Sequence, residues 1–455
     1  MTATLLALAA ATAVGFAVSR CFTRGLALPE RAAWSFACGL LIHAGLYTAG
    51  ILLRVSPGPR KLLLAEGVVL AAALLARRGG GGGVPAPPPR DKWRGVWLLS
   101  LAAAAAGAAL FALSAVAEPM WTTDFLAIWG LKGKAIFFAG RIPESLFRDP
   151  ELAWSHPEYP LFLPLLFASL AAFARDWNDR ALALLYPAFH VATMLAAYGF
   201  LARRASRAAG AIAAALIGLF FPLYRAGHVG MADIPLAFGL VLLSSAFLDV
   251  LEDPSLSVRV RLALTSLFCA ATKQEGLLYA GLLAATMLVA PRPMKRGLRS
   301  LDLVALLLPP AAHTALFRAS FDRRDHRDFD LTLLSPGRWP ELSGRVWEVA
   351  GRLLTEEVAA AALALVAIAA LLLCTPRSPA DRLLAPLAAQ LVIVAGVCAL
   401  SVYGAVWHAR ASFGRTAAAL FPVAAIILGA RSGRIFQGGG VGSRAPGLPS
   451  IGAVL

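Results

Sequence analysis

The stretch GVWLLSLAAAAAGAALFALSAVA, residues 95–117, contains no charged side chain. As a helix rising 1.5 Å per residue it reaches about 34 Å, enough to cross a hydrocarbon core of roughly 30 Å. Similar blocks recur between short arginine-rich connectors, so that 59% of the 455 residues are apolar and 15% are charged. This composition is typical of a helical membrane protein, and the two-residue alternation of a membrane β-barrel is not seen.

The sequence predicts an all-α polytopic membrane protein with about 13 transmembrane helices. The expected spans lie at about 2–19, 33–53, 61–76, 95–117, 181–202, 208–224, 234–251, 259–271, 276–291, 301–319, 355–374, 383–402 and 414–430. The first lacks a basic segment before it, which favours a membrane span over a cleaved signal peptide.

The segment LFLPLLFASLAAFA, residues 161–174, is too short for a confident span, so its placement rests on the charges around it. If it lies along the outer interface without crossing, the arginine-rich connectors all share one face. That face is expected to be cytoplasmic, because basic residues concentrate in cytoplasmic loops. The N-terminus is then outside and the C-terminus inside.

The formal charge of +16 comes from basic residues placed in twos and threes between apolar spans. Such residues set orientation, and we therefore expect no nucleic-acid partner. The cysteines are scattered without paired spacing and are predicted to be small core residues, with no metal or redox centre: Cys21, Cys38, Cys269, Cys374 and Cys398.

We divide the chain into three parts. Residues 1–94 hold N-terminal transmembrane helices and a Gly/Pro-rich cytoplasmic linker. Residues 95–431 form the main transmembrane module, with a long outer loop at 118–180. Residues 432–455 are predicted to be a short disordered cytoplasmic tail.

In this topology the unusual polar residues lie on the outer side, in five segments. These are 118–180, RAGHVGMAD (225–233), TKQEG (272–276), 320–345 and WHARASFGR (407–415). Their common side predicts that they converge on one face of the membrane.

Asp124 follows the fourth expected span by a few residues and precedes an apolar-faced helix that carries Trp129, Lys132 and Lys134 and suits the membrane interface. A carboxylate held there can accept a proton from a sugar or protein hydroxyl. The alternative is that Asp124, after Thr122 and Thr123, caps this helix.

The motif HPEYPLFLP, residues 156–164, fixes a stiff turn, because three prolines exclude a helix interior. Glu158 and Tyr159 are then presented from a rigid loop. The alternative is a structural turn in which His156 and Glu158 are simply solvated.

Asp233 begins one span, and Lys273 and Glu275 separate two others. Ionisable groups at such depths are expensive, which favours a functional role with one another as partners. The alternative is an ion pair that only ties helices together.

His408, Arg410 and Arg415 lie at the mouth of the last span. A guanidinium there can hold a lipid phosphate by two parallel hydrogen bonds. The alternative is that it anchors the span at headgroup level.

Between about Trp97 and Arg431 the chain resembles the GT-C superfamily of polyprenyl-phosphate-sugar-dependent glycosyltransferases, which includes protein O-mannosyltransferases and lipid A aminoarabinose transferases. The motifs that carry the resemblance are TTDFLAIW, HPEYPLFLP, MADIPLAF, TKQEG and ASFGR. Each is short, and their order and common side make the combination moderately specific.

The resemblance implies a GT-C-like fold, with interfacial helices in the first long outer loop, and an inverting sugar transfer from a polyprenyl-phosphate donor to a lipid, glycan or protein hydroxyl. Asp124 matches the family's general base, and Asp233 its supporting acid. The other residues expected to bind substrate are Lys132, His156, Glu158, Tyr159, Lys273, Glu275, His408, Arg410 and Arg415. No cofactor is required, and a divalent metal ion is left open. The expected location is a bacterial inner membrane, among membrane lipids, with the site facing the periplasm or cell exterior.

Some features depart from the family. Three spans precede the one before the catalytic loop, and Asp124 lacks the paired Asp-Glu of the protein mannosyltransferases. Three other functions are considered. The first is a transporter or lipid flippase, and the second is a polysaccharide polymerase or ligase that uses the DRRDHRDFD segment (322–330). The third is a family member that binds a lipid-linked sugar without catalysis. The loop 320–345 also reads as a solvated connector.

Overall fold

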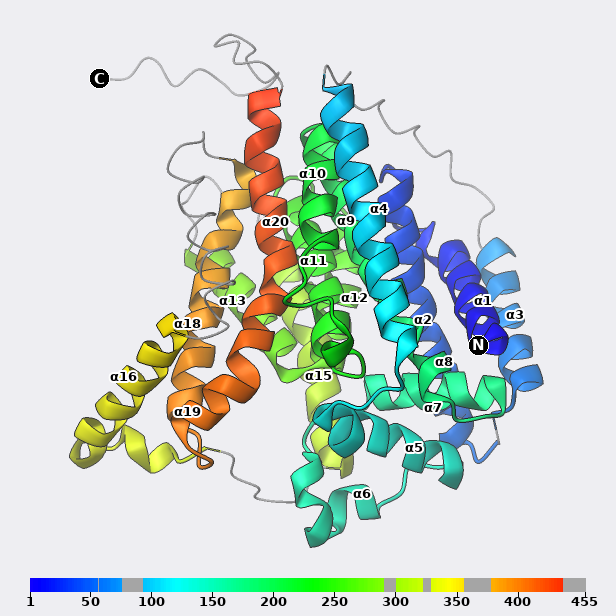
Figure 1. The fold of residues 1–455 in the computed structure, drawn as a ribbon. Coiled ribbons are helices and arrows are strands. Elements are labelled where there is room, and N and C mark those ends of the chain that lie inside the picture. The colour runs from blue at the N-terminus through cyan, green and yellow to red at the C-terminus, as the bar shows by residue number, and fades with distance from the viewer. Residues whose placement is uncertain (56, 76–92, 290–299, 322–328, 356–377, 437–455) are drawn as a thin grey trace.

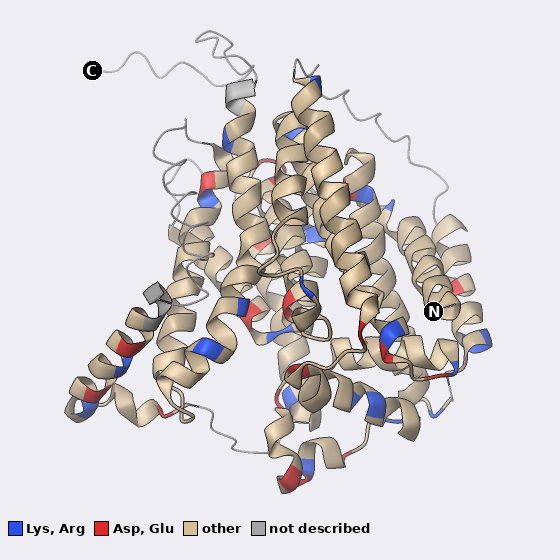
Figure 2. Ribbon diagram, in the orientation of Figure 1, with Lys and Arg blue, Asp and Glu red and all other residues tan. Residues whose placement is uncertain are grey.

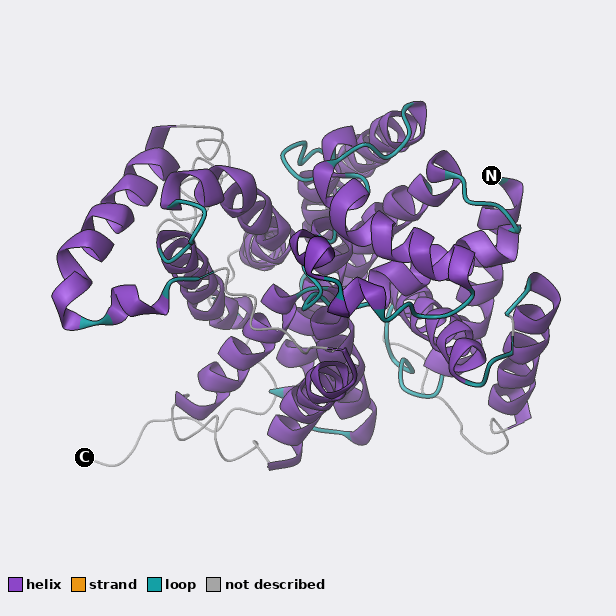
Figure 3. Ribbon diagram, turned by 90° about the horizontal axis from the view of Figure 1, so that it is seen from below, coloured by secondary structure: helices purple, strands orange, loops and turns teal. Residues whose placement is uncertain are grey.

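The computed structural model describes residues 1–55, 57–75, 93–289, 300–321, 329–355 and 378–436. In these ranges the chain is helical and forms no strand apart from one isolated bridge between Phe329 and Ser401 (Figure 1 and Figure 3). Eight helices among them are long and apolar enough to cross a membrane. The all-helical, multi-span prediction is confirmed at this level.

Twelve of the described helices, some too short to be among those eight, overlap expected spans, with bounds that differ by up to six residues. They are α1 (Thr2–Ser19), α2 (Leu28–Leu52), α3 (Pro59–Leu75), α4 (Arg94–Ala117), α9 (Leu185–Arg204), α10 (Arg207–Gly218), α11 (Asp233–Val250), α12 (Leu256–Thr272), α13 (Gln274–Val289), α15 (Ser300–Phe321), α18 (Leu384–Ala399) and α20 (Gly414–Phe436). The expected span at 355–374 falls almost wholly outside the described residues, so the total of about 13 stays a prediction. Figure 2 shows that most of the length of these helices carries neither acidic nor basic residues.

Helix α11 is the centre of the bundle: all of its side chains are buried, and it packs against α9, α12, α13 and α20. Its sequence is apolar or hydroxyl-bearing between Asp233 at one end and Asp249 near the other. About 24 Å of helix separates these two carboxylates, at 1.5 Å per residue. Each carboxylate belongs to a separate cluster of charges, and the part of α11 between them carries no charged residue.

Small residues let the helices approach closely, as is usual for helix pairs in membranes. Where α4 crosses α10, a Cβ atom added to Gly107 would lie only 2.1 Å from the carbonyl oxygen of Gly218. Glycine is therefore required at residue 107 for this crossing.

A layer of short helices lies across the lower ends of the long ones (Figure 1). It contains α5 (Gly130–Ala139), α6 (Ser145–Arg148), α7 (Phe162–Ala174) and α8 (Asp179–Ala183). Helix α7 corresponds to the short apolar segment expected not to cross, and nearly all of its side chains are buried. It packs against α2 and α5.

The apolar face that precedes and enters α5 differs from the sequence-based expectation. The apolar-faced helix after Asp124 was expected to suit the membrane interface, but its Phe125, Trp129 and Ile136 side chains are buried inside the protein. The reason is α7, which presents an apolar surface directly to α5. This packing fixes the loop that carries Asp124.

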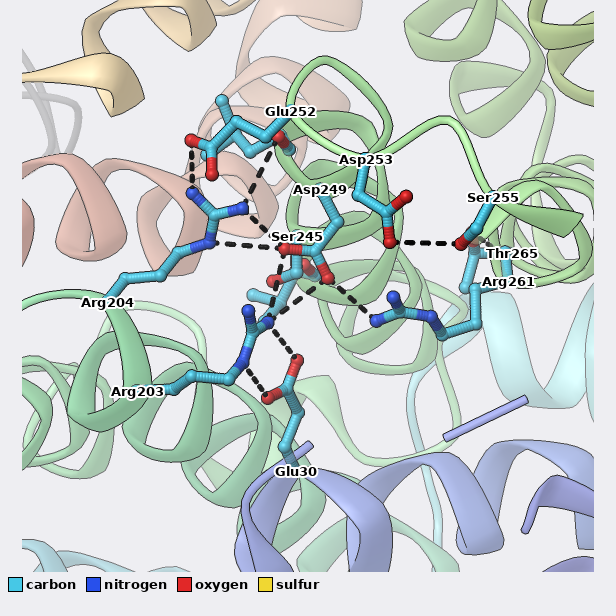
Figure 4. A network of polar contacts seen from close by, with 12 residues as sticks. Glu30, Arg203, Arg204, Ser245, Asp249, Glu252, Asp253, Ser255, Arg261 and Thr265 are labelled. Carbon is cyan, nitrogen blue, oxygen red and sulfur yellow. Dashed lines mark hydrogen bonds and ion pairs between the residues drawn. The ribbon is translucent and has the colours of Figure 1, made fainter. Parts of the chain in front are cut away.

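At the opposite end of α11, a network of ion pairs joins α2, α9, α11 and α12 (Figure 4). Arg203 contacts both Glu30 and Asp249, and Asp249 also pairs with Arg204 and Arg261. The N-terminal helices are thus tied to the rest of the bundle by a buried carboxylate, Glu30.

A second, smaller apolar cluster lies around α16 (Trp339–Thr355), α18 and α19 (Ala405–His408), with Val349, Val394 and Cys398 among its buried members. Within the stretch 320–345, for which a solvated connector was one reading, an amphipathic helix begins at Trp339, and residues 322–328 lie outside the described residues. One side of α16 packs on α18 and α19, while Trp339 and Trp347 are exposed.

Candidate functional site

Five of the predicted residues form one continuous chain of charges at the lower end of the bundle. Lys273 Nζ lies 2.9 Å from Glu275 Oε1 and 2.8 Å from Asp233 Oδ1. Arg415 Nη1 lies 3.8 Å from Asp233 Oδ2 and 2.6 Å from Asp124 Oδ2. We call these five residues the outer charge cluster. It unites four of the five segments that were expected to converge.

The helix ends explain how the cluster is assembled. Asp233 opens α11, where a carboxylate interacts favourably with the helix dipole. Lys273 has an extended backbone that separates helix α12 from helix α13, and Glu275 lies in the first turn of α13. Arg415 lies in the first turn of α20, and Asp124 has a helical backbone directly before the turn Phe125–Trp129.

The cluster has a closed side and an open side. The Asp233 and Lys273 side chains are 1% and 10% exposed, while those of Asp124 and Arg415 are 24% and 19% exposed. The Glu275 side chain is 23% exposed, so Asp124, Arg415 and Glu275 form the accessible part of the cluster.

Both members of the open pair border a π-helical turn. Residues Phe125–Trp129 form one directly after Asp124, and Ala409–Phe413 form another just before Arg415. Such turns are rare and are found mostly at functional sites, where they re-aim side chains.

Asp124 does not act as a helix cap. Its side chain makes no capping hydrogen bond, and the amide of Phe125 instead donates to the hydroxyl of Thr122 at 3.4 Å. The carboxylate of Asp124 is therefore directed to Arg415, and the alternative predicted for it does not hold.

Gly230 holds the loop around Asp124 against the turn before α11. Its φ of 97° is strained for any other residue, and an added Cβ would lie 2.6 Å from Phe125 Cβ. The glycine thus allows the 225–233 turn to contact the residue next to Asp124.

The HPEYP turn forms a second group beside the cluster. His156 Nδ1 lies 2.9 Å from Glu158 Oε1, and the side-chain amide of Gln274 donates to the carbonyl of Glu158 at 3.4 Å. The ring of Tyr159 stacks between those of Trp129 and His156, with centroids 5.4 Å and 4.7 Å away. Burial raises the pKa of Tyr159, and the carboxylates of Glu275 and Glu158 act in the same direction.

Lys132 lies beneath this turn and is fully buried. Its ammonium group donates to the carbonyl oxygen of His156. Burial lowers the pKa of Lys132 to about 7, against the opposing effect of Glu158. Lys132 was expected to bind substrate; in this structure its ammonium group contacts the backbone of His156 beneath the HPEYP turn.

His408 and Arg410 are the other two predicted residues near the last span. His408 Nδ1 lies 3.0 Å from the hydroxyl of Ser401, and its ring neighbours Phe329. Arg410 is exposed on the π-helical turn. Of the three predicted residues near the last span, the cluster includes only Arg415.

Arg225 and His228 were not singled out from the sequence. His228 is buried, its Nδ1 lies 3.0 Å from the carbonyl of Leu223, and Arg225 Nε lies 3.4 Å from its Nε2. Burial lowers the pKa of His228 to about 4, with the charge of Asp233 opposing the shift. The signal available in the sequence was their place in the turn that ends at Asp233.

The outer charge cluster contains three carboxylates and two cations, so it can both accept a proton and hold an anion. Within the described residues, no group of His, Cys, Asp or Glu side chains is arranged to hold a metal ion.

Comparisons with protein-family models, curated proteins and solved structures give no match for this chain.

Proposed function

We propose that the protein is a membrane glycosyltransferase that moves a sugar from a polyprenyl-phosphate donor to a hydroxyl acceptor at the outer face of the membrane. The observation that carries the proposal is the Asp124–Arg415 pair, a carboxylate and a guanidinium 2.6 Å apart at the open side of the outer charge cluster. These two groups match the two demands of the reaction, a proton acceptor and a phosphate holder.

The proposed reaction is a single displacement with inversion. The acceptor hydroxyl gives its proton to the carboxylate of Asp124, and its oxygen forms a bond to the anomeric carbon. The bond from that carbon to the phosphate oxygen breaks, and its electron pair leaves with the polyprenyl phosphate. The leaving group gains negative charge, so it needs nearby cations and no proton.

Arg415 and Lys273 are the cations assigned to this charge. Arg415 reaches the open side, and Lys273 lies behind it, held by Asp233. Donors fixed before the reaction stabilise developing charge without reorganising.

The HPEYP turn is assigned to the sugar or the acceptor. Within the described residues, the buried atoms Trp129 Nε1 and Glu158 Oε2 have no hydrogen-bond partner. A ligand with several hydroxyl groups would satisfy both, and the stacked rings of Trp129, Tyr159 and His156 supply an aromatic wall beside them.

The proposed location is a bacterial inner membrane with the cluster on the periplasmic or exterior side. Support comes from the two ends of α11: the arginine-rich network of Figure 4 is at one end, and the outer charge cluster is at the other. The positive-inside rule assigns the arginine-rich end to the cytoplasm.

A transporter or flippase remains the second candidate, because one ionisable pair does lie within apolar helices. His43 Nδ1 of α2 lies 2.7 Å from Glu66 Oε1 of α3, with side chains 0% and 3% exposed. A transporter predicts further such groups along a path. The uncharged middle of the central helix α11 instead favours an enzyme that opens at one end.

The test uses the purified protein in lipid nanodiscs with a panel of polyprenyl-phosphate sugars and membrane-extracted acceptors. Release of polyprenyl phosphate that depends on the acceptor supports a transferase. Movement of the lipid-linked sugar between leaflets of proteoliposomes, without release of polyprenyl phosphate, supports the flippase and contradicts the proposal.

A further inference from the structure

Arg415 is hydrogen-bonded to its own helix through Nε and to two other segments through Nη1. Its Nε donates to the carbonyl of Ala411 in the same helix, while Nη1 donates to Asp124 Oδ2 at 2.6 Å and to the sulfur of Met231 at 2.9 Å. The guanidinium is thus fixed at its base, and its outer end is held mainly by Asp124.

The inner part of the cluster remains paired without Asp124. Asp233 bonds to Lys273 at 2.8 Å and faces Arg415 at 3.8 Å, and Lys273 also contacts Glu275. If Asp124 moved away, Arg415 would still have the charge of Asp233 behind it. Asp124 is therefore the removable partner.

A phosphate bound at Arg415 Nη1 competes with the carboxylate of Asp124 for the same donor atom. Both are anions, and at hydrogen-bond distance from one guanidinium edge they repel each other. A bidentate phosphate would use Nη1, the atom that now holds Asp124.

We propose that Asp124 is an internal competitor for a phosphate site on Arg415, and that a phosphate monoester or diester binds by displacing it. The last consequence rests on the proposed function: the carboxylate becomes a proton acceptor only after the donor phosphate has taken its place. The protein then keeps its base in an ion pair while the donor site is empty, and the donor must bind before the acceptor is activated.

The test is a binding measurement with farnesyl phosphate on the full-length protein in nanodiscs, so it needs no turnover. Asp124→Asn removes the competing charge and is expected to tighten farnesyl phosphate binding by about tenfold, the scale of one charge-assisted hydrogen bond. Glu151→Gln is the matched control, since it removes one exposed negative charge from the same loop outside the cluster. Its affinity is expected to equal that of the parent.

Arg415→Lys provides the second arm. In this background the Asp124→Asn gain is expected to shrink, because the bidentate site is lost. Farnesol, which lacks the phosphate, is expected to show no gain. A gain for farnesyl phosphate larger than that for inorganic phosphate supports a lipid headgroup, and an equal gain supports a phosphate site that does not require the lipid.

Unchanged or weaker binding by Asp124→Asn would overturn the proposal, as would a gain with farnesol. This outcome is separate from the fate of the proposed function. If Asp124→Asn binds farnesyl phosphate more tightly and the parent transfers no sugar, the competitor role stands and the transferase is contradicted. If the parent transfers sugar and Asp124→Asn does not bind more tightly, the transferase stands and the competitor role is contradicted.

Discussion

Lys273 Nζ lies 2.8 Å from Asp233 Oδ1, and this contact joins the end of α12 to the start of the central helix α11. Both side chains are nearly withdrawn from solvent. The pair forms the closed side of the outer charge cluster and fixes the background on which Arg415 and Asp124 act.

Breaking this pair from one side is expected to be costly. Lys273→Met leaves the Asp233 carboxylate buried without its ammonium partner, and we expect a loss of about 3–5 kcal/mol in the free energy of unfolding. The double variant Asp233→Asn with Lys273→Met is expected to lose less than Lys273→Met alone. Unfolding titrations with sodium dodecyl sulfate in mixed micelles measure both. Additive losses would show that the two residues are not coupled.

Gly230→Ala is expected to damage both stability and the site. The variant combines a strained φ with a Cβ placed 2.6 Å from Phe125 Cβ, next to Asp124. Gly140→Ala is the control, because it has a similar positive φ of 60° and nothing within 4 Å. We expect about 1 kcal/mol of destabilisation for the control and more for Gly230→Ala. Turnover is expected to fall on the order of 100-fold in Gly230→Ala alone, since small displacements of a base are that costly.

The buried ammonium of Lys132 predicts a pH-dependent stability. Its pKa is lowered to about 7 in the folded protein from the ordinary value of 10.5, so between these pH values the unfolded chain binds more protons. Stability then rises with pH across this window, by at most about 1.4 kcal/mol per pH unit, and is lost as pH falls toward 7. Lys132→Met lacks this contribution. The difference in unfolding free energy between the parent and Lys132→Met is expected to change from pH 7 to 10, and a constant difference would contradict the burial argument.

The network in Figure 4 predicts unequal effects of two glutamates. Glu30 is 1% exposed and pairs with Arg203, whereas Glu252 is 50% exposed and pairs with Arg204. Glu30→Gln is expected to cost about 3 kcal/mol of unfolding free energy, and Glu252→Gln less than about 1 kcal/mol. Equal effects in micelle unfolding titrations would mean that Glu30 does not tie α2 to the bundle.

The sequence predicted the helices well because each was marked by its own residues. Apolar runs and flanking charges located α1, α4 and α11 to within a few residues. The segment that forms α7 was expected not to cross, because crossing would have placed the arginines of residues 203–207 on the outer side; α7 lies across the ends of the long helices (Figure 1).

The pairing inside the site was less accessible to sequence analysis. Asp124 and Arg415 are 291 residues apart, and no local pattern says that they meet. The full burial of Lys132 depends on how α5 packs on α7, and the separation of His408 from the cluster depends on its contact with Ser401. These are tertiary contacts, which amphipathic patterns do not encode.

The most direct test of the central claim compares turnover of the parent and Asp124→Asn in nanodiscs, with polyprenyl phosphate release as the readout and donor binding measured in parallel. We expect the parent to transfer sugar to the acceptor. Asp124→Asn is expected to bind the donor and react at least about 100-fold more slowly, the contribution typical of a general base. Parental turnover by Asp124→Asn would contradict the assignment of this carboxylate as the base.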